Sequence, residues 1–146
     1  FVVHGHDDHA KEMMARFLEK NDFEAIVLHE QASGNKTIIE KIEHYADVGF
    51  AIILLTPDDM GKSKDADNYQ PRARQNVILE LGYFMGKLGR NRVCAFKLGD
   101  LEIPTDFSGV IWNPLDNAGA WKQILSKELS EAGYDLDSNK LLKSLG

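Results

Sequence analysis

The run Phe50-Ala51-Ile52-Ile53-Leu54-Leu55 lies near the middle of the 146-residue chain and contains no polar residue. An apolar run of this length is typical of a strand that is buried on both faces of a parallel sheet. Shorter strand-like runs precede and follow it, at residues 1–3, 25–28, 92–96 and 110–112. Segments with a helical spacing of apolar residues separate the strands, at residues 8–20, 37–45, 76–87 and 120–132.

This alternation predicts the fold class. Parallel strands need crossover connections, which are usually helices and almost always right-handed. We therefore expect an α/β domain with a doubly wound, five-stranded parallel sheet. We assign it to residues 1–133 and expect a C-terminal tail or linker helix at 134–146 that leads to a module outside this chain. The longest polar stretch, residues 56–74, is expected to be a loop.

The composition argues against several classes of protein. The 17 Lys and Arg residues against 23 Asp and Glu residues give a net charge of −6, whereas binders of nucleic acid or anionic membranes show a basic face. The single cysteine, Cys94, cannot form an internal disulfide, which favours a reducing, cytoplasmic location. No apolar run approaches the roughly 20 residues of a membrane-spanning helix. The chain begins at Phe1 inside a hydrophobic run, which suggests a fragment of a longer protein.

Polar residues follow four of the expected strands. They are His4-Gly5-His6-Asp7, His29-Glu30-Gln31, Thr56-Pro57-Asp58-Asp59 and Lys97-Leu98-Gly99. In a doubly wound sheet the ligand site lies outside the carboxyl ends of the strands. We therefore expect the functional site at this edge of the sheet.

Glu80 is an unusual residue within its helix, because its neighbours from residue 77 to residue 84 are mostly apolar. A carboxylate in such a place is either paired with a cation or kept free because its charge is used. Arg72, Arg74 and Lys87 are the possible ion-pair partners, and the residue pattern alone leaves the two alternatives about equal. The helix begins at the expected site, and Asn76 lies one turn before Glu80, so both face the same way. This position favours a functional Glu80.

Two other motifs carry less weight. The string from His4 to His9 fits the H-x-H-x-D-H pattern of zinc hydrolases, but the last histidine of the chain is His44, so the further ligands that such a site needs are missing. The string is better explained by polar residues that cap a helix and line the end of a strand. We therefore expect no bound metal. Gly61-Lys62-Ser63 lacks the upstream glycine and strand of a phosphate-binding loop.

With these residues placed, the chain resembles a bacterial TIR domain. It is similar to the branch described as predicted nucleotide-binding proteins, which includes the TIR parts of bacterial TIR–STING and related anti-phage effectors. The resemblance covers roughly residues 1–133, and the matching stretches are residues 1–7, 28–31, 37–41, 51–59 and 72–89. It implies a flavodoxin-like sheet of strand order 2-1-3-4-5.

The resemblance also implies an NAD⁺ glycohydrolase with Glu80 as the catalytic residue. NAD⁺ is then the substrate, and no cofactor is expected. Many TIR enzymes carry Trp four residues before the glutamate, where this chain has Asn76. The residues implied in substrate binding are His4, Gly5, His6, Asp7, Gln31, Lys36, Thr56, Arg74 and Asn76.

Two alternatives remain open. A helix with the pattern E-L-G-x-x-x-G-K, which residues 80–87 nearly match, also resembles nucleoside deoxyribosyltransferases, in which a glutamate attacks the sugar. Many TIR domains serve only as self-assembling adaptors. For the enzyme we expect self-association into an oligomer or filament, and a cyclic-nucleotide-sensing module elsewhere in the full protein. We expect neither nucleic acid nor a membrane among its partners.

Overall fold

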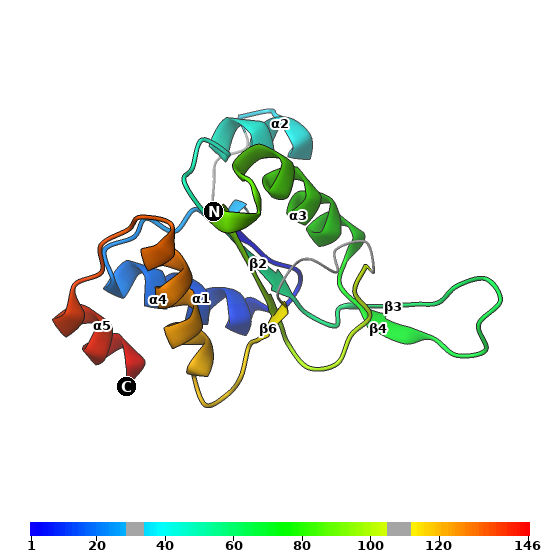
Figure 1. Cartoon of the computed structure of the whole chain (residues 1–146). Coiled ribbons are helices and arrows are strands. Elements are labelled where there is room, and N and C mark those ends of the chain that lie inside the picture. The colour runs from blue at the N-terminus through cyan, green and yellow to red at the C-terminus, as the bar shows by residue number, and fades with distance from the viewer. Residues whose placement is uncertain (29–33, 105–111) are drawn as a thin grey trace.

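A parallel sheet forms the centre of the computed structural model, which describes residues 1–28, 34–104 and 112–146 (Figure 1). Its four strands lie in the order β1-β2-β5-β6, and all three pairings are parallel. The strands are β1 (Val2–Val3), β2 (Ala51–Leu55), β5 (Val93–Lys97) and β6 (Trp112–Pro114). This arrangement confirms the α/β class and the doubly wound sheet.

Two of the five expected strands differ from their patterns. Residues 25–28 contribute one parallel bridge among the described residues, from Val27 to Val2. This bridge places the segment beside β1, so the order agrees with the expected 2-1-3-4-5. The last strand begins at Trp112, which pairs with Ala95, while residues 110 and 111 lie outside the described residues.

The alternation of side chains along β2 divides the core into two clusters. Ala51, Ile53 and Leu55 point to one face, and Ile52 and Leu54 point to the other, as the two-residue period of a strand requires. The first face is covered by α2 (Ile38–Tyr45) and α3 (Gln75–Leu88). The second is covered by α1 (Asp8–Lys20) and α4 (Ala120–Glu131), so helices cover both faces (Figure 1).

The boundaries of helices α1 to α4 agree with the expected ones to within one residue. At the start of α1, Asp7 Oδ1 accepts a hydrogen bond from Ala10 N at 2.9 Å. Thr37 and Glu40 form a reciprocal capping box at the start of α2. Each cap satisfies amide groups that the first helical turn leaves without partners.

The stretch from 56 to 74 is the main error of the sequence-based expectation. It is not simply a loop, because it contains an antiparallel hairpin of β3 (Asp59–Gly61) and β4 (Gln70–Arg72) that projects from the body of the domain (Figure 1). A contact remote in sequence holds its base, where Arg72 Nη2 donates to Glu102 Oε2 at 2.7 Å. Local residue patterns contain no information about such a partner.

The C-terminal segment packs on the domain. Helix α5 (Ser138–Leu145) lies against α1, where Asn21 Nδ2 donates to Ser144 Oγ at 3.0 Å and Lys140 pairs with Asp22. Leu141 and Leu145 join the second core cluster. The helix at the expected tail is therefore present, and the domain boundary at residue 133 stays a prediction.

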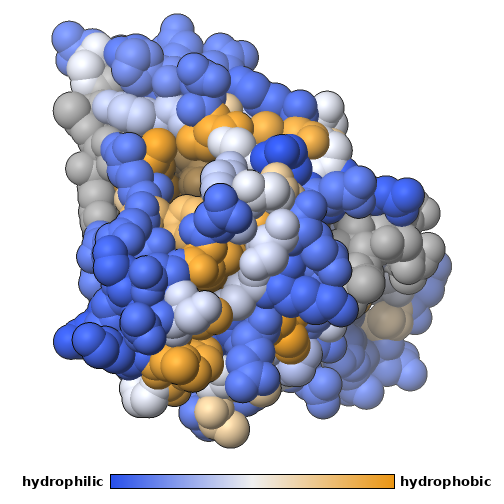
Figure 2. Space-filling model, turned by 60° about the vertical axis from the view of Figure 1, so that its left-hand side comes forward, coloured by the Kyte–Doolittle hydropathy of each residue, from blue (hydrophilic) through white to orange (hydrophobic). Residues whose placement is uncertain are grey.

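The face drawn in Figure 2 is mainly hydrophilic, with hydrophobic residues in patches between the polar ones. The large hydrophobic side chains that are exposed are Ile38, Ile39, Met60, Tyr69, Leu79 and Leu142. Within the described ranges, every helix is too short or too polar to cross a membrane.

Candidate functional site

A cavity of about 90 Å³ opens at the carboxyl end of β1, between that strand and the first turns of α3. The sequence analysis placed the site at this edge of the sheet. The cavity brings together four of the predicted site residues, His4, Arg74, Asn76 and Glu80, with an apolar lining of Val2, Val3, Leu28, Ile38 and Val77.

Glu80 is the buried polar group of this cavity, with 9% of its surface exposed. Within residues 1–28, 34–104 and 112–146, no hydrogen bond or ion pair reaches its carboxylate, and Arg72 is engaged by Glu102 instead. Burial raises the pKa of Glu80 to about 7, and the nearby charge of Arg74 opposes this rise. The ion-pair alternative is therefore not observed in the described part of the chain, and the carboxylate faces a cavity.

The neighbours of Glu80 in the cavity differ in chemistry. Asn76 is exposed and lines the same cavity as Glu80, as the spacing of four residues along α3 predicts. Arg74 is the N-cap residue of α3 and brings a positive charge to the rim. The Nδ1 atom of His4 lies 2.8 Å from Gly5 O, which fixes the orientation of the ring. The cavity thus combines one carboxylate, one amide and one cation.

Asp58 is a residue that the site prediction missed. Its Oδ2 atom accepts hydrogen bonds from His6 N at 3.0 Å and from Thr56 Oγ1 at 2.8 Å, so it joins the loop after β1 to the end of β2. A Cβ atom at Gly5 would overlap this carboxylate oxygen, so any larger residue there would force Asp58 to move. The position of Asp58 after a buried strand was the available signal, but its partners are set by the packing of the two strands.

The remaining predicted site residues lie outside the described lining of the cavity. Gly5, His6 and Thr56 surround Asp58, and Asp7 caps α1. Lys36 is exposed just before α2. Gln31 lies outside the described residues.

The histidines of the H-x-H-x-D-H string do not converge on a metal site. Among the residues that the structure describes, there is no group of three or more His, Cys, Asp and Glu side chains that could hold an ion. Instead, His6 contributes its backbone amide to Asp58, and His9 lies on the exposed side of α1.

A doubly wound parallel sheet defines a class of α/β domains that bind their ligands at the carboxyl ends of the strands, which is where Glu80 lies. Comparison with models of protein families shows which family of this class the chain belongs to. Residues 1–117 match the model described as "CAP12/Pycsar effector protein, TIR domain", and the chain belongs to this family. The TIR resemblance predicted from the sequence is confirmed.

Several curated proteins are similar to this chain. The protein YuaY of Escherichia coli K12, described as uncharacterized, is 48% identical over 99% of this chain and 48% of its own length. Protein tirC of Dictyostelium discoideum is 35% identical over 77% of this chain and 61% of its own length. Pycsar effector protein XpPycTIR of Xanthomonas perforans is 39% identical over 47% of this chain and 22% of its own length. The chain thus spans about half to three fifths of the first two relatives.

The raised pKa of Glu80 predicts how stability depends on pH. The carboxyl group has a pKa of 4.5 as its ordinary value and about 7 in the fold, so the folded state binds the proton more tightly between these values. Above pH 7 the ionised side chain therefore destabilises the fold, by up to about 3 kcal/mol. We expect Glu80→Gln to raise the urea unfolding midpoint at pH 8, and to change it much less at pH 5.

Glu43→Gln is the matched control, because Glu43 is an exposed carboxylate on α2. It should shift the midpoint little at either pH. A Glu80→Gln variant that is destabilised at pH 8 would show that the carboxylate has a stabilising partner.

The contact between Gly5 and Asp58 makes a second prediction. In Gly5→Ala the new methyl group must displace the Asp58 carboxylate or the loop, and the two hydrogen bonds of Asp58 are weakened. We expect a loss of about 1–3 kcal/mol in the free energy of unfolding, measured by urea denaturation.

Two further variants test the cause. In an Asp58→Ala background, Gly5→Ala should cost much less, because the clashing oxygen is gone. Gly82→Ala on α3, where an added Cβ meets no atom within 4 Å, should be neutral or stabilising. Equal costs of Gly5→Ala in both backgrounds would disprove the proposed clash.

Proposed function

We propose that this domain is an NAD⁺ glycohydrolase that cleaves the nicotinamide–ribose bond and releases nicotinamide with ADP-ribose or a cyclic form of it. The observation that carries the proposal is a buried Glu80 carboxylate that faces a cavity and has no partner among the described residues. A buried ionisable group without a partner is destabilising, and such groups are concentrated at functional sites.

The chemistry of the substrate explains why one carboxylate suffices. Nicotinamide in NAD⁺ is cationic and leaves as a neutral molecule, so its departure needs no general acid. The C1′–N bond breaks with its electron pair on nitrogen, and the ribose develops the charge of an oxocarbenium ion. Water then adds to C1′ and loses a proton, or an adenine nitrogen adds instead to give the cyclic product. A fixed carboxylate stabilises the positive charge where it develops.

The other residues of the cavity support this role. The apolar part of the lining strengthens the attraction between Glu80 and the sugar cation, because it lowers the local dielectric constant. The Asn76 amide can hydrogen-bond to ribose hydroxyl groups, and the Arg74 guanidinium can bind a phosphate. In this proposal the loops after the first two strands, with His4, Gly5, His6 and Asp7 in one and Gln31 to Lys36 in the other, frame the dinucleotide.

The family supports the biological setting that we propose. Relatives are named Pycsar effector proteins and CD-NTase-associated protein 12, and the family model carries the word effector. We propose that the domain acts in the cytoplasm as an anti-phage, abortive-infection effector. A cyclic-nucleotide-sensing module elsewhere in the full protein would control it.

Substitution of Glu80 tests the activity directly. We expect Glu80→Gln and Glu80→Ala to lower the rate of nicotinamide release from NAD⁺ by about a hundred- to a thousandfold, which corresponds to about 3–4 kcal/mol of lost transition-state stabilisation. The wild-type rate should rise as the pH increases through 7, because the reaction needs the ionised carboxylate. Nicotinamide release is measured by chromatography.

The Glu43→Gln variant again serves as the control and should keep the wild-type rate. Near-full activity of a folded Glu80 variant would contradict the assignment. A wild-type domain that leaves NAD⁺ intact even when it is clustered would favour the adaptor function. Cleavage of a deoxynucleoside in place of NAD⁺ would favour the deoxyribosyltransferase.

Self-association is part of the proposal, because the cavity of about 90 Å³ is too small to enclose even the nicotinamide riboside end of NAD⁺. Small-molecule sites usually measure about 300–1,000 Å³. The exposed side chains of Ile38 and Ile39 lie on α2, and Ile38 also lines the cavity. A second copy seated on this helix would bury them and add a wall to the site.

Enzyme concentration therefore becomes a test. We expect the activity per molecule to rise with concentration, and Ile39→Asp, at a residue that is 61% exposed, to suppress this rise. The measurement is the rate of nicotinamide release over a dilution series, with and without forced clustering. Leu142→Asp on α5, at a residue that is 68% exposed, should leave the concentration dependence unchanged. Strictly proportional rates down to the dilute monomer would contradict the idea.

A further inference from the structure

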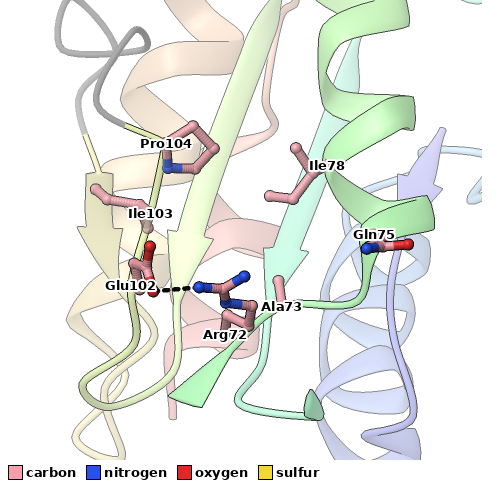
Figure 3. A pocket seen from close by; sticks show the side chains of 7 residues that line it. All are labelled: Arg72, Ala73, Gln75, Ile78, Glu102, Ile103 and Pro104. Carbon is pink, nitrogen blue, oxygen red and sulfur yellow. Dashed lines mark hydrogen bonds and ion pairs between the residues drawn. The ribbon is translucent and has the colours of Figure 1, made fainter. Parts of the chain in front are cut away.

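A second cavity, of about 260 Å³, lies beside the first turn of α3 and the segment that follows β5 (Figure 3). Ile78 of α3 forms one wall, and Ile103 and Pro104 form the opposite wall (Figure 3). The ion pair of Arg72 with Glu102 and the side chain of Gln75 add polar groups to the lining. The function proposed above makes no use of this cavity.

The lining resembles that of a site for an aromatic heterocycle. Small-molecule sites are mostly apolar and contain a few polar groups that fix the orientation of the ligand. The aliphatic side chains of Ile78, Ile103 and Pro104 can cover the faces of a flat ring. The Glu102 carboxylate can accept a hydrogen bond from an exocyclic amine, and the Gln75 amide can both donate and accept. A sugar or a phosphate would leave the apolar walls without a partner.

The two cavities flank the same helical turn. Arg74, Asn76 and Glu80 line the first cavity, whereas Gln75 and Ile78 line the second. A helix with its side chains is about 10–12 Å across, so a distance of this order separates the cavities. Two ring systems joined by a flexible linker can span it.

The N-terminus of α3 lies between the two cavities and is suited to an anionic linker. Among the described residues, no side chain caps its first turn, and the sequence of that turn contains no acidic residue. Backbone amides at the start of a helix and the positive end of the helix dipole attract anions. Arg74, at the N-cap, adds a full positive charge.

We infer that the second cavity holds the adenine ring of a dinucleotide whose nicotinamide riboside end lies at Glu80 and whose diphosphate crosses the first turn of α3. The inference rests on the proposed function, which identifies the end that reacts. It assigns the specificity for a dinucleotide, as opposed to a mononucleotide, to residues 72–78 and 102–104 of this chain. Because adenine in this cavity is held away from C1′, the inference favours linear ADP-ribose over the cyclic form.

Binding of AMP is the first test, because AMP carries the adenine end alone. In a methyl NMR titration of the wild-type domain, we expect millimolar AMP to shift the Ile103 signal. Ile78→Trp fills the cavity and should abolish this shift. Leu79→Trp is the matched control, because Leu79 is the next residue on α3, is 60% exposed and lines neither cavity; it should leave the shift unchanged.

Kinetics give the second test. Ile78→Trp should raise the KM for NAD⁺ by about tenfold and leave nicotinamide release from nicotinamide mononucleotide unchanged, because that substrate has no adenine. Ile78 also packs against the core, so Gln75→Trp at an exposed lining residue provides a variant with less risk to folding.

The outcomes separate the two proposals. An Ile103 signal that does not respond to AMP, or that responds equally in the filled variants, overturns the adenine site whatever the activity is. A wild-type domain that leaves NAD⁺ intact overturns the glycohydrolase, and the AMP titration still decides whether the cavity accepts adenine.

Discussion

The removal of the Glu80 carboxylate from water is the constraint on which this end of the molecule depends. The first turns of α3 must cover the sheet with Val77, Leu81 and Phe84, and the same packing draws Glu80 into an apolar environment. Arg72, which could have neutralised it, is held by Glu102. The folded state therefore retains a carboxylate that would be more stable in water. This is the reverse of what stability alone would favour, and it is the reason why we propose a functional role for the group.

The parallel sheet supplies the geometry around this group. The carboxyl end of β1 brings His4 to the cavity, and Asp58, just beyond β2, holds the loop that follows His4. Gly5 allows the two segments to approach each other, because a side chain there would overlap Asp58. The rim of the site is thus built by contacts between strands that are some 50 residues apart in the sequence, and its rigidity comes from the sheet.

Membership of the CAP12/Pycsar effector TIR family agrees with this arrangement, because the family match covers residues 1–117 and includes every residue of both cavities. The positive end of α3 lies between the cavity that contains Glu80 and a larger, mostly apolar one. A single helical turn can therefore contact three chemically different parts of one ligand. The small volume of the Glu80 cavity and the exposed residues of α2 are the observations on which the proposed self-association rests.

The periodicity of apolar residues was sufficient to predict the α/β class, the bounds of α1 to α4 to within a residue and the position of Glu80 at the sheet edge. Burial on one helix face or on both strand faces leaves such a local signal. The single bridge of residues 25–28 and the hairpin of β3 and β4 left no such signal. Both involve partners that are remote in sequence, Val2 for Val27 and Glu102 for Arg72. In the same way, the sequence predicted Arg72 and Arg74 as possible ion-pair partners of Glu80. Only the tertiary structure could show whether an ion pair forms. Whether two charges meet depends on side-chain directions and desolvation, which arise when remote segments pack together.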